Sequence, residues 1–390
     1  MRIKRAQSKK RSKLRHNFTL FDLYPCLDPA QISARLTTKK QVDGAKFTRA
    51  APPIKGNPHG SDDAVVNILV TGGAGYVGSH ACKALKAVGY TPVTFDNLSS
   101  GWRDAVQFGP FVFGDINSPS CLKNAFQQYQ PQAICHFAAL SDISESQHQP
   151  AQYWLTNVMG SLNLLQAAQL NGCNNIIFSS TCAVYGDQPR VPLTENAPLN
   201  PSNAYAASKL AAEHLLQNFQ HIMPLKYLIF RYFNVAGADP TGRLGECHMP
   251  ETHLIPRLLQ AAEADKNIQV FGTNYQTPDG TCLRDFIHVS DIAQAYVCGV
   301  QWLLHGKASQ IFNLGSGRGY SVLQVISAVS KLTGQKLKIS AAPRRPGDCA
   351  SLQADVTRVA QALGWSAQRS SLDMIIRDAQ RWQQGGGYAQ

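Results

Sequence analysis

Short apolar runs alternate with longer helix-like stretches from Val65 to about Gly237. Because buried strands read as short apolar runs bounded by turn residues, strands are predicted at residues 66–70, 91–95, 111–113, 133–137, 175–179 and 227–230. The stretch 80–88 predicts the first helix. Strands that alternate with helices predict an α/β protein with a Rossmann-type doubly wound parallel sheet, which binds its ligands at the carboxyl ends of the strands.

The rhythm changes beyond Gly237, where loops rich in Pro and Gly separate scattered helices. This change predicts a smaller C-terminal substrate-binding domain. We expect the Rossmann domain to span residues 65–240 and to be completed by part of 286–315. The smaller domain then comprises residues 241–285 and 316–385.

Positive charge is concentrated at the N-terminus. Residues 1–62 hold fourteen Lys and Arg but only four Asp, which accounts for most of the net charge of +12. We expect a basic, disordered leader, either a targeting or tethering signal or a dispensable extension. The rest of the chain is close to neutral, which excludes a basic groove for nucleic acid on the folded body and leaves only the leader for such binding.

The remaining composition predicts a soluble cytoplasmic protein that does not associate with a membrane. No apolar run reaches the ~18 residues of a membrane-spanning helix. The ten cysteines are scattered without a C-x-x-C pair, which is typical of reduced thiols. No H-E-x-x-H motif and no Cys/His cluster at zinc spacing occurs, so no metal site is expected.

A glycine-rich turn, residues 71–78, follows the first predicted strand and opens the first helix. Glycines in such a turn let the backbone approach a pyrophosphate, whose charge meets the helix N-terminus. Asp96 closes the second strand, where a carboxylate accepts from a ribose hydroxyl and repels a 2′-phosphate. The pattern therefore predicts NAD rather than NADP. The alternatives are a flexible turn, and a turn-opening role for Asp96.

Tyr205 and Lys209 stand four residues apart, so a helix places them on one face. A free phenol titrates near pKa ~10 and is a poor base at neutral pH. Lys209 and a positively charged nicotinamide would both lower the pKa of Tyr205, so we expect Tyr205 to act as a base. Thr181, at the end of the preceding strand, is expected to donate to a developing carbonyl oxygen. For the Tyr/Lys pair alone, an exposed helical pair is the alternative.

A series of motifs runs from about residue 66 to residue 365: TGGAGYVGSH, FDNLSSG, FGDI, HFAAL, FSSTCAVYGDQP, YAASK, RYFNVAGA, PETHLIP, DGTCLRDFIHV, NLGSG and PRRPGD. The series resembles that of the UDP-glucose (UDP-galactose) 4-epimerase family of extended short-chain dehydrogenases/reductases. The early motifs are shared by many reductases, whereas DGTCLRDFIHV and PRRPGD are more specific to nucleotide-sugar epimerases.

The resemblance implies the residues of each site. The residues implied for NAD binding are Gly72, Gly75, Tyr76, Val77, Gly78, Asp96, Asn97, Asp115, Ile116, Phe137, Ala138, Ala139, Asn157, Lys209 and Phe233. Those implied for the UDP-sugar are Thr181, Asn234, His253, Leu254, Phe271, Arg284, Arg345 and Asp348. Arginine suits the diphosphate because its rigid fork binds phosphate oxygens bidentately. For Arg284 and Arg345 the alternative is a surface ion pair.

The implied activity is that of an NAD-dependent isomerase that interconverts UDP-glucose and UDP-galactose through a transient 4-keto sugar. A UDP-sugar and a second copy of the chain, in a homodimer, are the expected partners. A pentose or N-acetylhexosamine 4-epimerase has the same chemistry with a different pocket. A 4,6-dehydratase is disfavoured because Cys182 and Ala183 stand where its acid and base are expected. Intact Thr181, Tyr205 and Lys209 argue against a non-catalytic NAD sensor.

This chain departs from the family pattern at several positions near the expected sites. Thr181 replaces a frequent serine, and Ser141 stands where some members carry a lysine near the NAD phosphates. Nearer the sugar, Phe286 replaces a frequent tyrosine and His253 a frequent asparagine. A fifth position, Leu352, falls where a residue thought to gate N-acetyl sugars is found, so the acceptance of hexosamines stays open.

Overall fold

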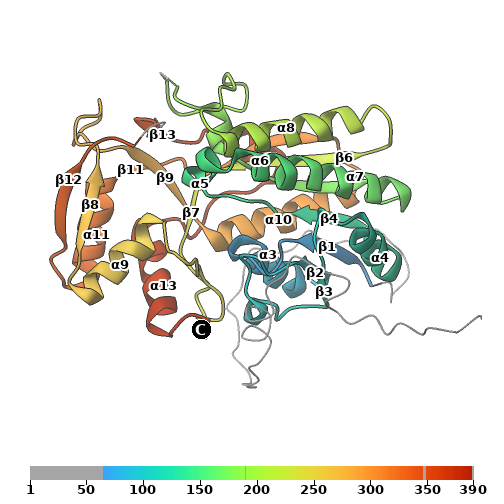
Figure 1. The fold of residues 1–390 in the computed structure, drawn as a ribbon, viewed down its shortest axis with the longest axis horizontal. Helices are drawn as coiled ribbons and strands as arrows, with labels where there is room; N and C mark the ends of the chain where they lie inside the picture. The colour runs from blue at the N-terminus through green and yellow to red at the C-terminus, as the bar shows by residue number, and fades with distance from the viewer. Residues whose placement is uncertain (1–64, 189, 346–347, 389–390) are drawn as a thin grey trace, which may run out of the picture. The chain divides into compact units, whose positions relative to one another are not determined.

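A parallel seven-stranded sheet organises the larger half of the protein (Figure 1). The structure is a computed structural model that describes residues 65–188, 190–345 and 348–388, so the prediction for the leader 1–62 lies outside the described residues. The strands are β1 (Asn67–Thr71), β2 (Thr91–Asp96), β3 (Phe111–Phe113), β4 (Ala133–His136), β5 (Asn175–Thr181), β6 (Lys226–Tyr232) and β10 (Gln310–Leu314). Their order, β3-β2-β1-β4-β5-β6-β10, confirms the doubly wound Rossmann fold.

Helices cover both faces of this sheet. They are α3 (Tyr76–Ala87), α4 (Pro119–Tyr129), α5 (Ile143–His148), α6 (Pro150–Tyr153), the π-helical turn η2 (Trp154–Met159), α7 (Gly160–Leu170), α8 (Ala204–Phe219) and α10 (Val289–Leu304). Two short 3-10 turns, η1 (Arg103–Ala105) and η3 (Cys182–Tyr185), complete this half.

The alternation of side chains along the strands explains the two layers. Ile68 and Val70 of β1 face α3 and α10 in one buried cluster, whereas Leu69 faces α4, α7 and α8 in a second cluster. Because successive strand side chains point to opposite faces, one apolar run supplies both cores.

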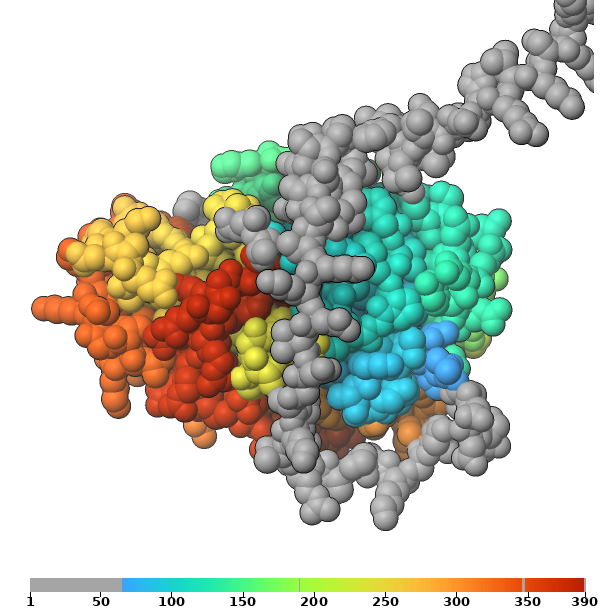
Figure 2. Space-filling view, turned by 90° about the horizontal axis from the view of Figure 1, so that it is seen from below, coloured from blue at the N-terminus to red at the C-terminus, as the bar shows by residue number. Residues whose placement is uncertain are grey.

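The smaller half is built from two short sheets. The first contains β7 (Asn234–Ala236), β9 (Leu283–His288), β11 (Gly319–Ser321) and β13 (Ser351–Leu352), and the second pairs β8 (Asn267–Phe271) with β12 (Lys338–Ala342). Its helices are α9 (Leu254–Ala264), α11 (Val322–Thr333) and α13 (Leu372–Gln384), whereas α12 (Thr357–Leu363) packs against β10 and α10 of the larger half, although the sequence placed it in the smaller domain. Apolar side chains of α9, α11 and α13 form its core with β8. Figure 2 shows α13, in red, beside the yellow segment that leads into α9.

Most predicted strands match the structure to within two residues. The first helix begins at Tyr76 rather than at residue 80, because Gly75 has the extended conformation of an N-cap and the glycine turn passes directly into the helix. Strand β7 follows β6 closely but pairs with β9 of the smaller half, although the sequence placed residues up to 240 in the Rossmann domain. None of the described helices is long and apolar enough to cross a bilayer.

Candidate active site

The glycine turn brings three backbone segments into close approach. Gly72 has a φ of +72°, and a Cβ at this position would lie 2.6 Å from the Ala138 nitrogen. A Cβ on Gly78 would lie 2.2 Å from the Gly72 oxygen. Only glycine fits such positions. Helix α3 starts here without a side-chain cap or an acidic residue in its first turn, so its N-terminal N–H groups fit the pyrophosphate of a dinucleotide.

The acidic residues predicted for the nucleoside lie at the carboxyl ends of β2 and β3. The Asp96 carboxylate is buried and accepts from the backbone N–H groups of Ala74, at 3.0 Å, and Leu98, at 2.8 Å. Asn97 donates to Asp115 over 2.9 Å. Burial raises the pKa of Asp96, and the two backbone hydrogen bonds oppose that rise. Asp96 therefore joins the glycine turn to the sheet. This position is compatible both with a turn-opening role and with the predicted contact to a ribose hydroxyl.

Other residues predicted for NAD bond to the protein itself. The Tyr76 hydroxyl donates to the Gly237 carbonyl over 2.6 Å. The Asn157 amide accepts from the Leu140 N–H and donates to the Leu140 carbonyl and the Ser208 hydroxyl. These two side chains therefore fix the positions of the backbone at Gly237 and Leu140.

The predicted catalytic residues come together at the end of β5. Thr181 is the last residue of that strand, and Tyr205 and Lys209 lie on α8, whose N-cap Asn203 accepts from the Ala206 N–H. Thr181 lies near enough to the Tyr205 hydroxyl to lower the pKa of that phenol. The Tyr/Lys pair is therefore not an exposed helical pair, because Lys209 is only 3% exposed.

Burial is the main cause of the pKa shifts of Tyr205 and Lys209 in the protein alone. Burial raises the pKa of Tyr205, which the nearby Thr181 only partly offsets. Burial also lowers the pKa of Lys209 to about 7, against the attraction of Glu213. In the protein alone, desolvation weakens the charge of Lys209 and penalises the Tyr205 phenolate. The lowering of the Tyr205 pKa by Lys209 together with a bound nicotinamide stays a prediction.

Residues predicted for the diphosphate and nucleoside pair with one another in the smaller half. Arg284 on β9 lies 3.1 Å from the Asp348 carboxylate and donates to the Cys349 carbonyl. The Arg345 guanidinium stacks over the Phe271 ring at 4.0 Å. The expected alternative of an ion pair therefore holds for Arg284, but the pair is half-buried rather than at the surface.

The residues at the end of β5 and those around Arg284 lie close together, between the seven-stranded sheet and the sheet that contains β9. Cys182, next to Thr181, packs in one buried cluster with Phe233, Cys349 and Leu352. The positive charge of Arg284 acts on the Cys182 thiol, although burial dominates and raises the pKa of that thiol. The end of β5 and the arginine of β9 thus face one region, which suits a substrate that spans both halves.

The remaining predicted residues lie on β7 and at the start of α9. Asn234 pairs in register with Phe286, and His253 is the N-cap that precedes Leu254. The His253 ring lies 2.6 Å from Glu246. Sequence reasoning missed three neighbours of His253, namely Glu246, His248 and Glu251. The signal was present as two Glu and two His within eight residues, but it matches no common metal motif.

Comparisons with known proteins agree with this geometry. The NAD dependent epimerase/dehydratase family matches residues 68–315. A UDP-glucose 4-epimerase of Rhizobium leguminosarum bv. trifolii is 43% identical over 316 residues, which cover 81% of this chain and 96% of the relative. The UDP-glucose 4-epimerase structure from Brucella ovis in complex with NAD is 45% identical, with a TM-score of 0.79 over 81% of this chain and 98% of that one.

A third relative was solved with a nucleotide sugar bound in addition to NAD. The UDP-glucose 4-epimerase structure from Stenotrophomonas maltophila, with bound NAD and formylated UDP-arabinopyranose, is 38% identical, with a TM-score of 0.80 over 82% of this chain and 98% of that one. The matched region contains the glycine turn, Thr181 and the Tyr205/Lys209 pair. The chain therefore belongs to the NAD dependent epimerase/dehydratase family and, within it, groups with the UDP-glucose 4-epimerases.

Proposed function

We propose that this protein is an NAD-dependent UDP-sugar 4-epimerase that interconverts UDP-glucose and UDP-galactose through a transient 4-keto sugar. The observation that carries the proposal is the placement of Thr181 at the carboxyl end of Rossmann strand β5, with Tyr205 and buried Lys209 one turn apart on α8. The names of the relatives, which match over most of their length, support the same activity.

The residues around the glycine turn fit NAD. The uncapped start of α3 suits the pyrophosphate, and Asp96, which stands where a 2′-phosphate would be repelled, suits NAD rather than NADP. Asn97 and Asp115 are proposed for the nucleoside. When bound, NAD supplies a reversible acceptor for the hydride at C4 of the sugar.

Three residues of this chain move and hold the proton. Tyr205 takes the proton of the 4-hydroxyl, and Thr181 donates to the oxygen as it becomes a carbonyl. Burial raises the pKa of Tyr205 and lowers that of Lys209 in the protein alone. Positive charge beside Tyr205 would favour its phenolate, and NAD, if held by the residues at the glycine turn, would supply such a charge.

The smaller half is proposed to bind the UDP moiety. Arg284 and Arg345 meet the diphosphate, and Asp348 accepts from a ribose hydroxyl. The present partner of Arg284 is Asp348, so substrate binding exchanges part of that ion pair for contacts with the ligand. Under this proposal, residues 65–240 with part of 286–315 hold the cofactor, and residues 241–285 and 316–385 hold the nucleotide sugar.

A homodimer is proposed from the apolar surface on α5 and η2. The side chains of Ile143, Trp154, Leu155 and Met159 are all large, apolar and more than 40% exposed. An apolar surface of this kind marks an interface, and a second copy of the chain would bury it. The proposed location is the cytoplasm, where thiols such as Cys82, Cys135 and Cys173, which are free and buried in the core, stay reduced.

The activity is tested by incubating the full chain separately with UDP-galactose, UDP-xylose and UDP-N-acetylglucosamine without added cofactor. Chromatography of the products should show UDP-glucose from UDP-galactose. Inversion of only the pentose or the N-acetyl sugar would move the substrate to an alternative pair. Inversion of none of the three would reject the epimerase assignment.

A further inference from the structure

Four side chains with metal-binding groups converge on the loop between β7 and α9. Glu246, His248, Glu251 and His253 each offer one ligand atom, and these atoms all lie within 4.8 Å of one another. The separations between His Nδ1 and Glu oxygens are 2.6, 3.2, 3.5 and 3.9 Å, with a mean of about 3.3 Å. Tetrahedral zinc with bonds of about 2.0–2.1 Å places neighbouring ligand atoms roughly 3.3 Å apart. The cluster therefore has nearly the spacing of a four-ligand site.

One ring nitrogen of the cluster has carboxylate neighbours but no well-aligned hydrogen bond. His248 Nδ1 is buried and lies 3.2 Å from Glu246 Oε1, and among the described residues it makes no hydrogen bond of normal geometry. A buried polar atom without a well-aligned hydrogen bond is costly. A metal ion between these two atoms would satisfy both of them.

The local charge favours a cation. Glu246 lies 3.2 Å from the His248 ring nitrogen and 2.6 Å from that of His253, and Glu251 lies within 3.9 Å of both. Two carboxylates thus set a negative potential around the histidines, and a divalent cation would neutralise it.

The loop is held in shape from outside the cluster. The indole N–H of Trp382 donates to the Glu246 carbonyl over 2.8 Å, and that of Trp102 donates to the Cys247 carbonyl over 2.8 Å. A Cβ on Gly245 would lie 2.2 Å from the Trp382 ring. Supporting contacts of this kind orient ligands before a metal binds and lower the entropy cost of binding.

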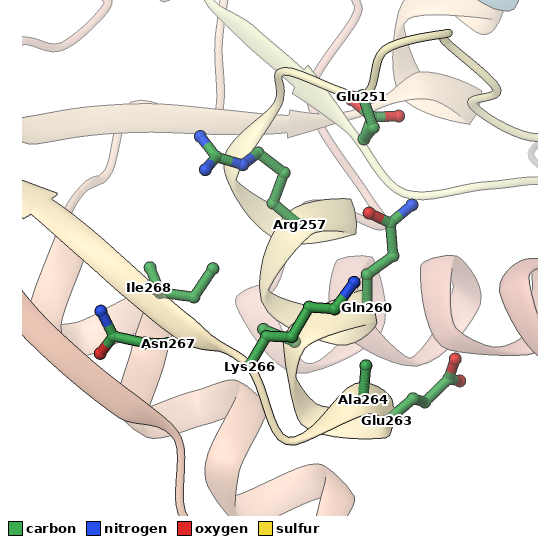
Figure 3. A pocket seen from close by; sticks show the side chains of 9 residues that line it. Glu251, Arg257, Gln260, Glu263, Ala264, Lys266, Asn267 and Ile268 are labelled. Carbon is green, nitrogen blue, oxygen red and sulfur yellow. The ribbon is translucent and has the colours of Figure 1, made fainter.

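The cluster is also accessible. The His253 side chain is about half exposed, and Glu251 lines a surface cavity of about 520 Å³ beside α9. Figure 3 shows Glu251 at one end of this cavity and the guanidinium of Arg257 directed away from it. The cavity, which Arg257 also lines, gives a hydrated ion a path to the Glu251 carboxylate.

We infer that Glu246, His248, Glu251 and His253 form a binding site for a divalent transition-metal ion of the zinc class. Two imidazoles and two carboxylates suit Zn²⁺, and four protein ligands make a closed, structural site rather than a catalytic one. The ion would fix the loop that leads into α9. This inference gives His253 a metal-binding role in place of the UDP-sugar contact that the resemblance implies, and no part of the cluster is needed for proton transfer at Tyr205.

The test is Zn²⁺ binding to the full chain, measured by competition with a chromophoric chelator, together with the absorption spectrum after loading with Co²⁺. One ion should bind per chain, should raise the melting temperature, and should give a Co²⁺ spectrum without thiolate-to-metal charge transfer. His248→Gln should weaken Zn²⁺ binding by at least about tenfold. His214→Gln, on the exposed face of α8, is the matched control and should bind like the unaltered protein.

Glu251→Gln serves as a second variant should His248→Gln fail to fold, and the same loss of at least about tenfold is expected. The inference is overturned by the absence of Zn²⁺ binding, by binding that both variants retain, or by thiolate charge transfer, which would assign the ion to cysteines. Because these readouts need no nucleotide sugar, a protein without epimerase activity could still support the site, and an active one could still refute it.

Discussion

The cofactor side and the substrate side of this protein are built in different ways. Around the glycine turn, the positions are set by backbone: Gly72 and Gly78 leave no room for a Cβ, and Asp96 is held by two backbone N–H groups. On the substrate side, long side chains bond to one another, as Arg284 does to Asp348 and Arg345 to Phe271. The first arrangement is rigid before a ligand binds, whereas the second can exchange partners.

This difference indicates that specificity for the sugar can change more easily than specificity for the cofactor. A rigid backbone site accepts one kind of ligand, and its residues are hard to replace without strain. Side-chain contacts tolerate substitution more easily. Three of the five departures from the family pattern, at His253, Phe286 and Leu352, are implied for the substrate side, whereas Ser141 is implied for the cofactor side, which keeps its glycines.

The largest effect on activity is expected at Tyr205, which is proposed to act on the sugar beside the cofactor. Tyr205→Phe should lower the turnover number by at least about 10²-fold, because only the proton acceptor is lost. Bound NAD, measured in the denatured protein, should stay at the level of the unaltered enzyme. Tyr129→Phe, at the end of α4, is the control and should keep full turnover. Near-normal turnover of Tyr205→Phe would remove Tyr205 as the base.

The rigidity of the cofactor side is tested at Gly78. Gly78→Ala should destabilise the fold by about 1–3 kcal/mol and reduce the bound NAD, since the new Cβ meets backbone atoms that cannot move away. Gly319→Ala is a matched control, because its Cβ would find only ordinary contacts, the nearest at 3.6 Å. Denaturant unfolding and NAD content measure both effects. Equal behaviour of the two variants would contradict a rigid turn.

The exchangeable substrate side is tested at Arg284. Arg284→Lys keeps the charge but loses the planar fork, so the KM for the UDP-sugar should rise roughly tenfold, about 1.4 kcal/mol, with little change in turnover number. Initial rates over a range of UDP-galactose concentrations measure this split. Arg377→Lys, on the exposed face of α13, should change neither parameter. A loss of bound NAD in Arg284→Lys would mean that the two sides are not separate.

The smallest effect concerns pH. Burial lowers the pKa of Lys209 from 10.5 to about 7, so between these values the unfolded chain binds a proton that the folded chain does not. Stability of the NAD-free protein should therefore rise with pH across that window, and Lys209→Met should flatten the rise. Melting temperatures at pH 7 and pH 9 measure it, with Lys86→Met, at the exposed end of α3, as control. An unchanged slope in Lys209→Met would show that Lys209 is not desolvated.

The contrast between the two sides also explains what the sequence could predict. The strands and the glycine turn are local patterns, and the Tyr205/Lys209 spacing is a local pattern too, so periodicity and spacing located them. The pairing of Arg284 with Asp348 joins residues 64 positions apart, which no local pattern encodes. The lowered pKa of Lys209 depends on burial among distant segments, and for that reason no local pattern could predict it.

The most direct test of the epimerase account follows the hydrogen at C4 of the sugar. The full chain, without added NAD, is incubated with UDP-galactose in D₂O, and the products are examined by NMR. The account predicts UDP-glucose that keeps protium at C4, because the hydrogen leaves and returns inside a closed site while only the hydroxyl proton exchanges through Tyr205. Deuterium at C4, or no UDP-glucose at all, would contradict it.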